Sequence, residues 1–269
     1  MNALCFNTMD RSAYLLGDED PDLPAQIRAA ARAGFPWIGP DAYSIQRFCD
    51  DGGRIETLAE ELDTAQIRTF ELPTLLVSRD VKGTRDEIKR LASYAHVLRP
   101  LFIQLNIDHE VDESVLDGLR RAGDTFGQIG ARLAIEYLPW LPAIRDIRST
   151  RDLLDQARVE GAGVLVDTWH FTHSADTWED LDDLPLSELA YVQFDDHPAL
   201  ASDDLVEETL QRRVMPGRGT FELERFCARI RAKGYTGPVS CEILSAITRE
   251  ADIDVVTRQI FQTSTPFWT

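Results

Sequence analysis

Four short apolar runs in the second half of the sequence each contain one side chain that can supply an oxygen ligand. These side chains are Glu136 in AIEYL, Asp167 in VLVDT, Gln193 in AYVQF and Glu242 in SCEIL. Such runs are typical of buried strands, and an ionised carboxylate is costly to bury unless something pairs with it. Carboxylate and amide oxygens suit Mn²⁺ or Mg²⁺ better than zinc, which prefers His and Cys. We therefore predict one divalent metal at these four residues, Mn²⁺ first, with Mg²⁺ or Co²⁺ as alternatives.

A divalent cation between two glutamates would support proton transfer next to a carbonyl group. Glu136 and Glu242 would approach from different sides of the metal, so one could remove a carbon-bound proton while the other returns it. A metal that binds the carbonyl and neighbouring hydroxyl oxygens acts as a Lewis acid and stabilises the enediolate. We predict an isomerase or epimerase of a small keto-sugar or keto-polyol, with these two glutamates as its catalytic residues.

Other interpretations fit the same residues. Loss of a β-hydroxyl group from the shared intermediate would make the protein a lyase, and the identity of the ligands does not separate elimination from isomerisation. A barrel that binds a sugar without reacting would keep the site as well. Alternatively, each carboxylate pairs with a separate arginine and no metal binds. For the isomerase, the lyase and the binding barrel, the expected partner is a small carbohydrate or a cyclic keto-polyol.

The elements that must position these residues alternate along the whole chain. Eight apolar runs predict parallel strands at residues 3–8, 35–40, 67–73, 101–107, 132–140, 163–171, 190–196 and 237–244. Amphipathic patterns predict helices at 21–34, 54–65, 84–98, 113–129, 149–161, 177–184 and 221–234. Thr84 with Glu87 predicts a capping box, and Gly34 predicts a helix end.

The length of the chain fits one closed α/β barrel. Such a barrel needs about 250 residues, and this sequence has 269. We therefore predict the α/β class and a single (β/α)8 TIM-barrel domain over residues 1–269. No G-x-G-x-x-G sequence follows any of the apolar runs, so dinucleotide binding has no support.

The composition argues against several classes of partner. A net charge of −18 opposes nucleic acids, whose binding relies on Lys and Arg. No apolar run reaches the length of about 18 residues that a membrane span requires. The N-terminus lacks a signal-peptide pattern and the four cysteines form no C-x-x-C pair, so the cytoplasm is the expected compartment. The sequence does not decide between a monomer and a homo-oligomer.

Five motifs resemble the sugar phosphate isomerase/epimerase superfamily, which contains xylose isomerase-like TIM barrels. They are E-Y-L-P-W, V-D-T-W-H-F, V-Q-F-D-D, R-V-M-P-G-R-G and G-P-V-S-C-E, all between residues 133 and 244. The resemblance implies one metal held by Glu136, Asp167, Gln193 and Glu242. It also implies that His170 and Arg213 bind substrate.

The substrate pocket carries further expectations. Trp140 and Trp169 lie close to ligand positions in the sequence and are expected to shape the pocket, unless they pack in the core. Many sugar epimerases of the superfamily have His where this chain has Gln193, whereas Gln is similar to some 3-dehydroshikimate dehydratases. Arg79 and His109 are candidates to hold the carboxylate of such a substrate. A phosphodiesterase like endonuclease IV would need many histidines, and this chain has five.

Overall fold

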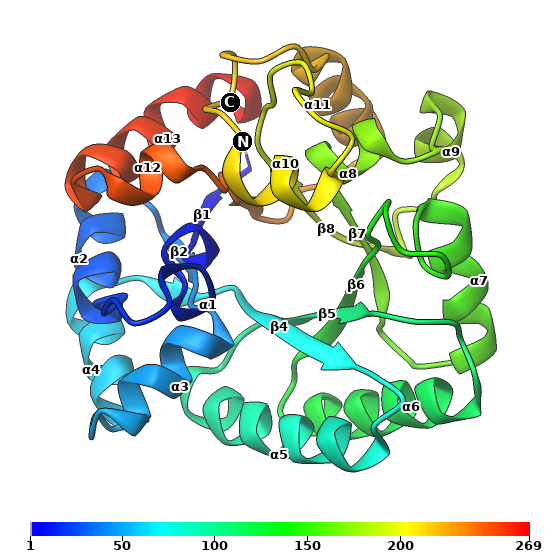
Figure 1. The fold of residues 1–269 in the computed structure, drawn as a ribbon, viewed down its shortest axis with the longest axis horizontal. Coiled ribbons are helices and arrows are strands. Elements are labelled where there is room, and N and C mark those ends of the chain that lie inside the picture. Colours follow the sequence, from blue (N-terminus) through cyan, green and yellow to red (C-terminus); the bar gives the residue numbers. More distant parts are fainter. Residues whose placement is uncertain (1) are drawn as a thin grey trace.

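The molecule is built around a barrel of parallel strands (Figure 1). The structure is a computed structural model that describes residues 2–269. The nine strands are β1 Leu4–Asn7, β2 Trp37–Gly39, β3 Arg68–Thr69, β4 Glu71–Val77, β5 Phe102–Ile107, β6 Arg132–Glu136, β7 Gly163–Asp167, β8 Leu189–Phe194 and β9 Val239–Cys241. They form one sheet in the order β3-β2-β1-β9-β8-β7-β6-β5-β4.

The third barrel strand is divided, which explains why nine strands replace the eight expected runs. Its first part, β3, pairs with β2, and its second part, β4, pairs with β5. β3 and β4 are the two edge strands of this sheet, and only Phe70 separates them in the chain. The backbone at Phe70 therefore closes the barrel. The predicted TIM-barrel fold is confirmed.

Helices surround the barrel on its outer side (Figure 1). The larger ones are α2 Leu23–Ala33, α3 Ala42–Asp50, α4 Ile55–Ala65, α5 Val81–Leu98, α6 Glu113–Gly127, α7 Ile147–Ala157, α11 Leu223–Ala232 and α13 Ile253–Trp268. Shorter ones are η1 Met9–Arg11, α1 Ala13–Leu16, α8 Thr168–His173, α9 Trp178–Asp183, α10 Leu205–Gln211 and α12 Ala246–Glu250. The C-terminal α13 packs against α2 and β1, so the first and last units are neighbours.

Several boundaries differ from the sequence prediction, and in two of them a capping aspartate is the cause. Helix α5 begins after Asp80, whose carboxylate accepts hydrogen bonds from two first-turn N–H groups, and Thr84 lies inside the helix. The run 163–171 is a strand only to Asp167, because this side chain caps α8 by accepting the N–H of His170 at 2.8 Å. Gly34 ends α2 with a φ of 104°, as predicted.

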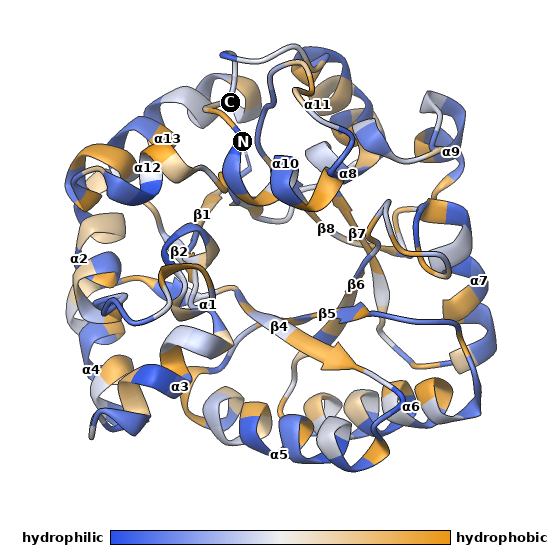
Figure 2. Ribbon diagram, viewed as in Figure 1, coloured by the Kyte–Doolittle hydropathy of each residue, from blue (hydrophilic) through white to orange (hydrophobic). Residues whose placement is uncertain are grey.

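The barrel strands and the inner faces of the helices form the hydrophobic core. Every residue of β7 is buried, as expected for a parallel strand that is covered on both faces. Figure 2 shows hydrophobic residues along β4 and hydrophilic residues on the outer sides of the peripheral helices. No helix in the described residues is both long and apolar enough to cross a membrane.

Candidate metal and substrate site

The four predicted ligands lie at the carboxyl ends of neighbouring barrel strands. Asp167 on β7 is the register partner of Gln193 on β8, and Glu136 ends β6. Glu242 directly follows β9, which pairs with β8. All four side chains are buried. The structure therefore brings together residues from positions 136 to 242 of the chain. They meet at the end of the barrel where TIM-barrel active sites lie.

Glu136 is held by two amides from the adjacent strand. Gln104 Nε2 and Asn106 Nδ2 on β5 donate to its Oε2, at 2.5 and 2.8 Å. Its other oxygen, Oε1, lies 3.4 Å from Nε2 of His170. Neither amide was predicted from the sequence. The two residues stand two positions apart in an apolar strand, so they share one face, and this pattern could have identified them.

Arg213 is enclosed by carboxylates. Its Nη1 lies 2.8 Å from Oδ2 of Asp167 and 3.3 Å from Oε2 of Glu242, and it also donates to Asp195. Its Nε and Nη2 donate to Thr209, and the side chain is only 1% exposed. Arg213, which we predicted to bind substrate, thus contacts protein groups that include two of the predicted metal ligands. It also lines the candidate cavity, so its contact with substrate stays a prediction.

This cluster has one cation for three buried carboxylates, and their pKa values diverge. Burial alone would raise the pKa of Asp167, but Arg213 and His170 together bring it below its ordinary value. Burial and the neighbouring negative charges raise the pKa of Asp195 and of Glu242 well above the ordinary range, against the opposing effect of Arg213. In the protein without metal, Asp167 is therefore the carboxylate most firmly ionised.

The donors present fit a divalent cation. Glu136, Asp167 and His170 each offer one ligand atom, and these atoms lie within 4.8 Å of one another. The buried Oε1 of Gln193 has no hydrogen-bond partner, and neither does the buried Nδ1 of His170. An unpartnered buried acceptor typically costs about 1–3 kcal/mol, which a cation would offset. In this arrangement Glu242 contacts Arg213 and the amide of Gln193, 3.4 Å away, and it is not among the three converging groups.

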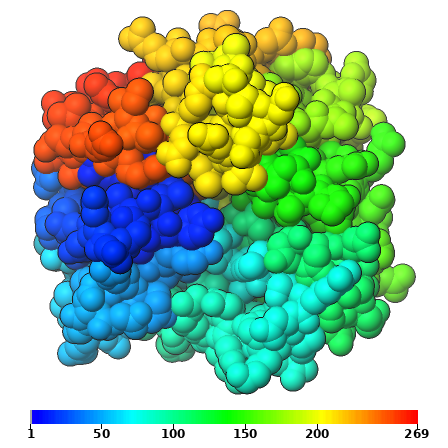
Figure 3. All heavy atoms as spheres, in the orientation of Figure 1, coloured from blue at the N-terminus to red at the C-terminus, as the bar shows by residue number. Residues whose placement is uncertain are grey.

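A cavity of about 310 Å³ opens onto these residues. Its polar lining includes Gln104, Asn106, Glu136, His170, Arg213 and Glu242. It lies on the face seen in Figure 3, where a recess is surrounded by the segments around α1 and α10, the loop after β6 and the end of β4. The predicted catalytic pair thus faces a space of the size that small-molecule sites have.

The other predicted pocket residues lie in different places. Trp140 lines the cavity, whereas Trp169 is buried behind it, with its ring 5.9 Å from the guanidinium of Arg213, and is absent from the lining. Trp169 belongs to α8, whose start at Thr168 turns the indole into the core. Arg79 is 60% exposed and pairs with Asp112 at 3.4 Å. His109 contacts Asp108 instead, so neither carboxylate-holding candidate lines the cavity.

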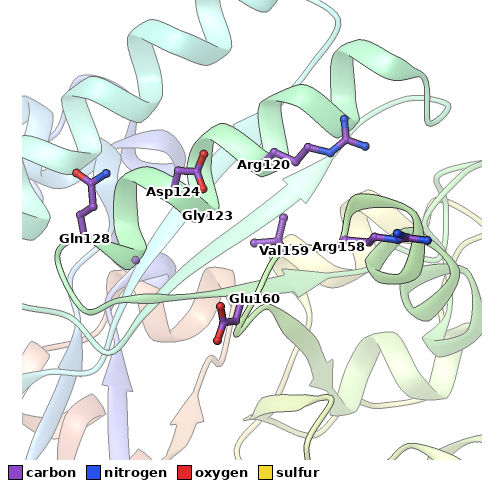
Figure 4. Close-up of a pocket in the computed structure, with 8 residues that line it drawn as sticks. Arg120, Gly123, Asp124, Gln128, Arg158, Val159 and Glu160 are labelled. Atoms are coloured by element: carbon purple, nitrogen blue, oxygen red, sulfur yellow. The ribbon is translucent and has the colours of Figure 1, made fainter.

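A larger cavity of about 750 Å³ lies away from this chemistry (Figure 4). It is formed by α6 and by residues 158–160 after α7, and its polar groups come from Arg120, Asp124, Gln128, Arg158 and Glu160. None of the predicted metal, catalytic or substrate residues lines it. We assign the candidate site to the smaller cavity because the buried carboxylates converge there and size alone carries no chemistry.

Glu71 is a buried carboxylic acid that sequence analysis did not single out. It accepts hydrogen bonds from Tyr191, Ser240 and Asn7, which belong to three other strands. Tyr191 and Ser240 each precede a predicted ligand by two residues, so Glu71 lies one layer deeper in the barrel. Burial raises its pKa to about 7, against the effect of these hydrogen bonds. A β-carbon on Gly39 would come within 2.6 Å of this side chain, so glycine leaves the space for it.

Replacing Glu71 by glutamine is expected to change how stability depends on pH. Its folded pKa of about 7 exceeds the ordinary 4.5, so the folded state binds the proton more tightly than the unfolded state. Wild-type protein should therefore lose up to about 3 kcal/mol as pH rises through that window, and E71Q should not. Urea unfolding of both proteins at about pH 5 and about pH 8 measures this. Parallel profiles would contradict it, and E222Q on the surface is the control.

Comparisons with known proteins agree with the barrel fold. The chain matches the family model described as xylose isomerase-like TIM barrel over residues 27–257. It is 28% identical over 236 residues to a 3-dehydroshikimate dehydratase of Pseudomonas putida. The aligned region covers 83% of this chain and 36% of the relative. The chain thus spans about a third of the length of that relative.

Two further matches cover nearly whole proteins. An inosose isomerase of Bacillus velezensis is 22% identical over 255 residues, 89% of this chain and 88% of the relative. The crystal structure of the IOLI protein with a bound zinc atom superposes with a TM-score of 0.85 at 18% identity, over 99% of this chain and 98% of that one. At that identity the superposition shows the fold alone. On the family match over most of its length, the chain belongs to the xylose isomerase-like TIM barrel family.

Proposed function

We propose that this protein is a divalent-metal-dependent isomerase or epimerase of a small, uncharged keto-sugar or cyclic keto-polyol. The observation that carries the proposal is the charge of the cavity. Among its described lining residues, Arg213 is the one guanidinium or ammonium group, and it already contacts carboxylates. Asp108, Glu136 and Glu242 line the same space. Apart from the metal itself, no cation among these lining residues is free to pair with a substrate carboxylate, whereas a neutral polyol needs no such partner.

The metal would be held by Glu136, Asp167, Gln193 and Glu242, with His170 as a further donor. When bound, it would supply Lewis-acid polarisation of the substrate carbonyl. Glu136 is placed to accept a carbon-bound proton, because it lines the cavity and the amides of Gln104 and Asn106 hold only its Oε2.

Glu242 is placed to return the proton. In the protein without metal, burial raises the pKa of its carboxyl group well above the usual range, so this group binds a proton more readily than an ordinary carboxyl group does. Its Oε2 is 3.3 Å from Arg213, whose charge stabilises the carboxylate left after the proton is given up. The two glutamates therefore differ in environment, and this supports opposite roles in one proton transfer.

A second candidate is a lyase that removes water from a β-hydroxy ketone. It is favoured by the relative of Pseudomonas putida, which is named a 3-dehydroshikimate dehydratase and is 28% identical. The same proton removal at Glu136 would begin that reaction. Arg79 and His109, the residues expected to hold a substrate carboxylate, lie outside the cavity lining, which is why we place this candidate second.

A substrate panel separates the two candidates. We expect protein supplied with Mn²⁺ to interconvert a neutral keto-cyclitol or ketose, and activity to be lost with a chelator and restored by Mn²⁺, Mg²⁺ or Co²⁺. Product formation is followed by NMR. In parallel, 3-dehydroshikimate is tested for the conjugated ultraviolet band that water loss creates. Turnover of 3-dehydroshikimate without turnover of any neutral ketone would overturn the first proposal in favour of the lyase.

A further inference from the structure

The outer half of the substrate cavity differs in chemistry from its inner half. At the inner end, Glu136 and Glu242 are each 6% exposed and are surrounded by hydrogen-bonding groups. At the mouth, Tyr14 is 58% exposed, and Leu76 and Val206 are each 40% exposed. The cavity thus changes from buried and polar to open and largely apolar along its depth, with the half-exposed Asp108 as the charged residue of its more open part.

The apolar residues of the mouth come from opposite sides of the barrel. Tyr14 in α1 and Tyr43 in α3 form an aromatic pair, with ring centroids 5.2 Å apart. Trp140 lines the cavity from the loop after β6, and its ring makes an edge contact with that of His170, with centroids 5.4 Å apart. In Figure 1 this loop and α1 lie on opposite sides of the barrel. Leu76 in β4 and Val206 in α10 also line the cavity, and the segments around β4 and α10 border the recess in Figure 3. Hence the mouth has aromatic walls on two sides.

A free polyol does not match this mouth. It carries hydroxyl groups on most of its carbons, and burying a hydroxyl without a hydrogen-bond partner is unfavourable. Flat apolar groups, in contrast, gain from contact with aromatic and aliphatic side chains. The volume of about 310 Å³ lies at the lower end of the range for drug-sized ligands. This leaves room for one ring beyond the reacting sugar and too little for a protein segment.

We propose that the mouth is a subsite for a flat apolar substituent, so that the substrate is a keto-sugar joined to an aromatic group. The inference rests on the proposed function, because that function places the keto-sugar at the inner end. The sugar ring would lie against Glu136 and Glu242, and the aromatic group would lie between the tyrosine pair and Trp140, over Leu76 and Val206.

The test uses ligands that cannot react, so binding is measured apart from turnover. Phenyl β-glucoside and methyl β-glucoside have no carbonyl group, and each is titrated calorimetrically into Mn²⁺-loaded protein. We expect the phenyl compound to bind at least about tenfold more tightly, from burial of its ring. In Y14A and V206S this ratio should fall to about threefold or less, while binding of the methyl compound stays unchanged. V255S, a valine on α13 with 43% exposure, is the matched control and should keep the full ratio.

The possible outcomes are distinguishable. Equal binding of the two glucosides, or a ratio that V206S leaves unchanged, would overturn the subsite. If light scattering shows that V206S instead converts a dimer to a monomer without altering the ratio, the mouth is a contact between copies and the subsite is equally overturned. If the ratio behaves as expected but no neutral ketone is turned over, the subsite stands and the proposed reaction fails.

Discussion

Replacing either Glu136 or Glu242 by glutamine is expected to lower turnover by about 10²–10⁴-fold, the usual contribution of general acid–base catalysis. Glutamine keeps an oxygen that can bind a cation and has nearly the same shape, so the change removes mainly the ability to exchange a proton. Steady-state rates on the substrate identified by the panel measure the loss, and metal analysis of each variant shows whether the cation is retained. A variant that keeps more than a tenth of wild-type activity would contradict the assigned role.

Isotope exchange distinguishes the two glutamates from each other. If each serves one side of the intermediate, each variant in D₂O should still exchange the proton of only one of the two interconverted compounds. NMR of the recovered compounds reads this directly. Loss of exchange from both compounds in both variants would mean that the residues act together and not in sequence. E188Q, the same substitution just before β8 at the far end of the barrel, is the control for effects of the change itself.

The strand ends of the second half could be predicted from sequence because of a simple regularity. A polar residue within an apolar run stands out, and parallel strands in a closed barrel bring their carboxyl ends to one rim. This reasoning placed Glu136, Asp167, Gln193 and Glu242 on neighbouring strands, where the structure has them. Gln104 and Asn106 carried the same kind of signal on β5, and they could have been found by extending the same inspection to the first half.

The partners of these residues could not be predicted, since they depend on tertiary contacts. Arg213 lies in an irregular segment between α10 and α11, and nothing in its neighbourhood in the sequence indicates that Asp167 and Asp195 enclose it. Glu71 lies within the run 67–73, and nothing in that run indicates which groups surround its side chain. Its surroundings come from Tyr191 and Ser240, which reach it only because the barrel closes.

Removing the positive charge of Arg213 is expected to destabilise the protein severely. In R213M three buried carboxyl groups lose the cation that they share, and breaking a buried ion pair by removing one partner typically costs about 3–5 kcal/mol. Chemical unfolding at neutral pH measures the loss. R212M is the matched control, because Arg212 is 35% exposed and pairs with Glu208; removal of this more exposed pair should cost about 1 kcal/mol or less.

The same variant has a signature that simple loss of packing would not produce. Without Arg213, the pKa values of Asp167, Asp195 and Glu242 should rise in the folded state, so the folded variant gains protons relative to the unfolded chain. Its stability deficit should therefore shrink as pH falls, and the D195N/R213M double variant should recover part of it at neutral pH because it buries one carboxyl group fewer. A deficit that is constant with pH and unchanged by D195N would show that the arginine contributes volume and not charge. That result would also mean that the charge of Arg213 is not neutralised by protein carboxylates. The preference for an uncharged substrate depends on this neutralisation.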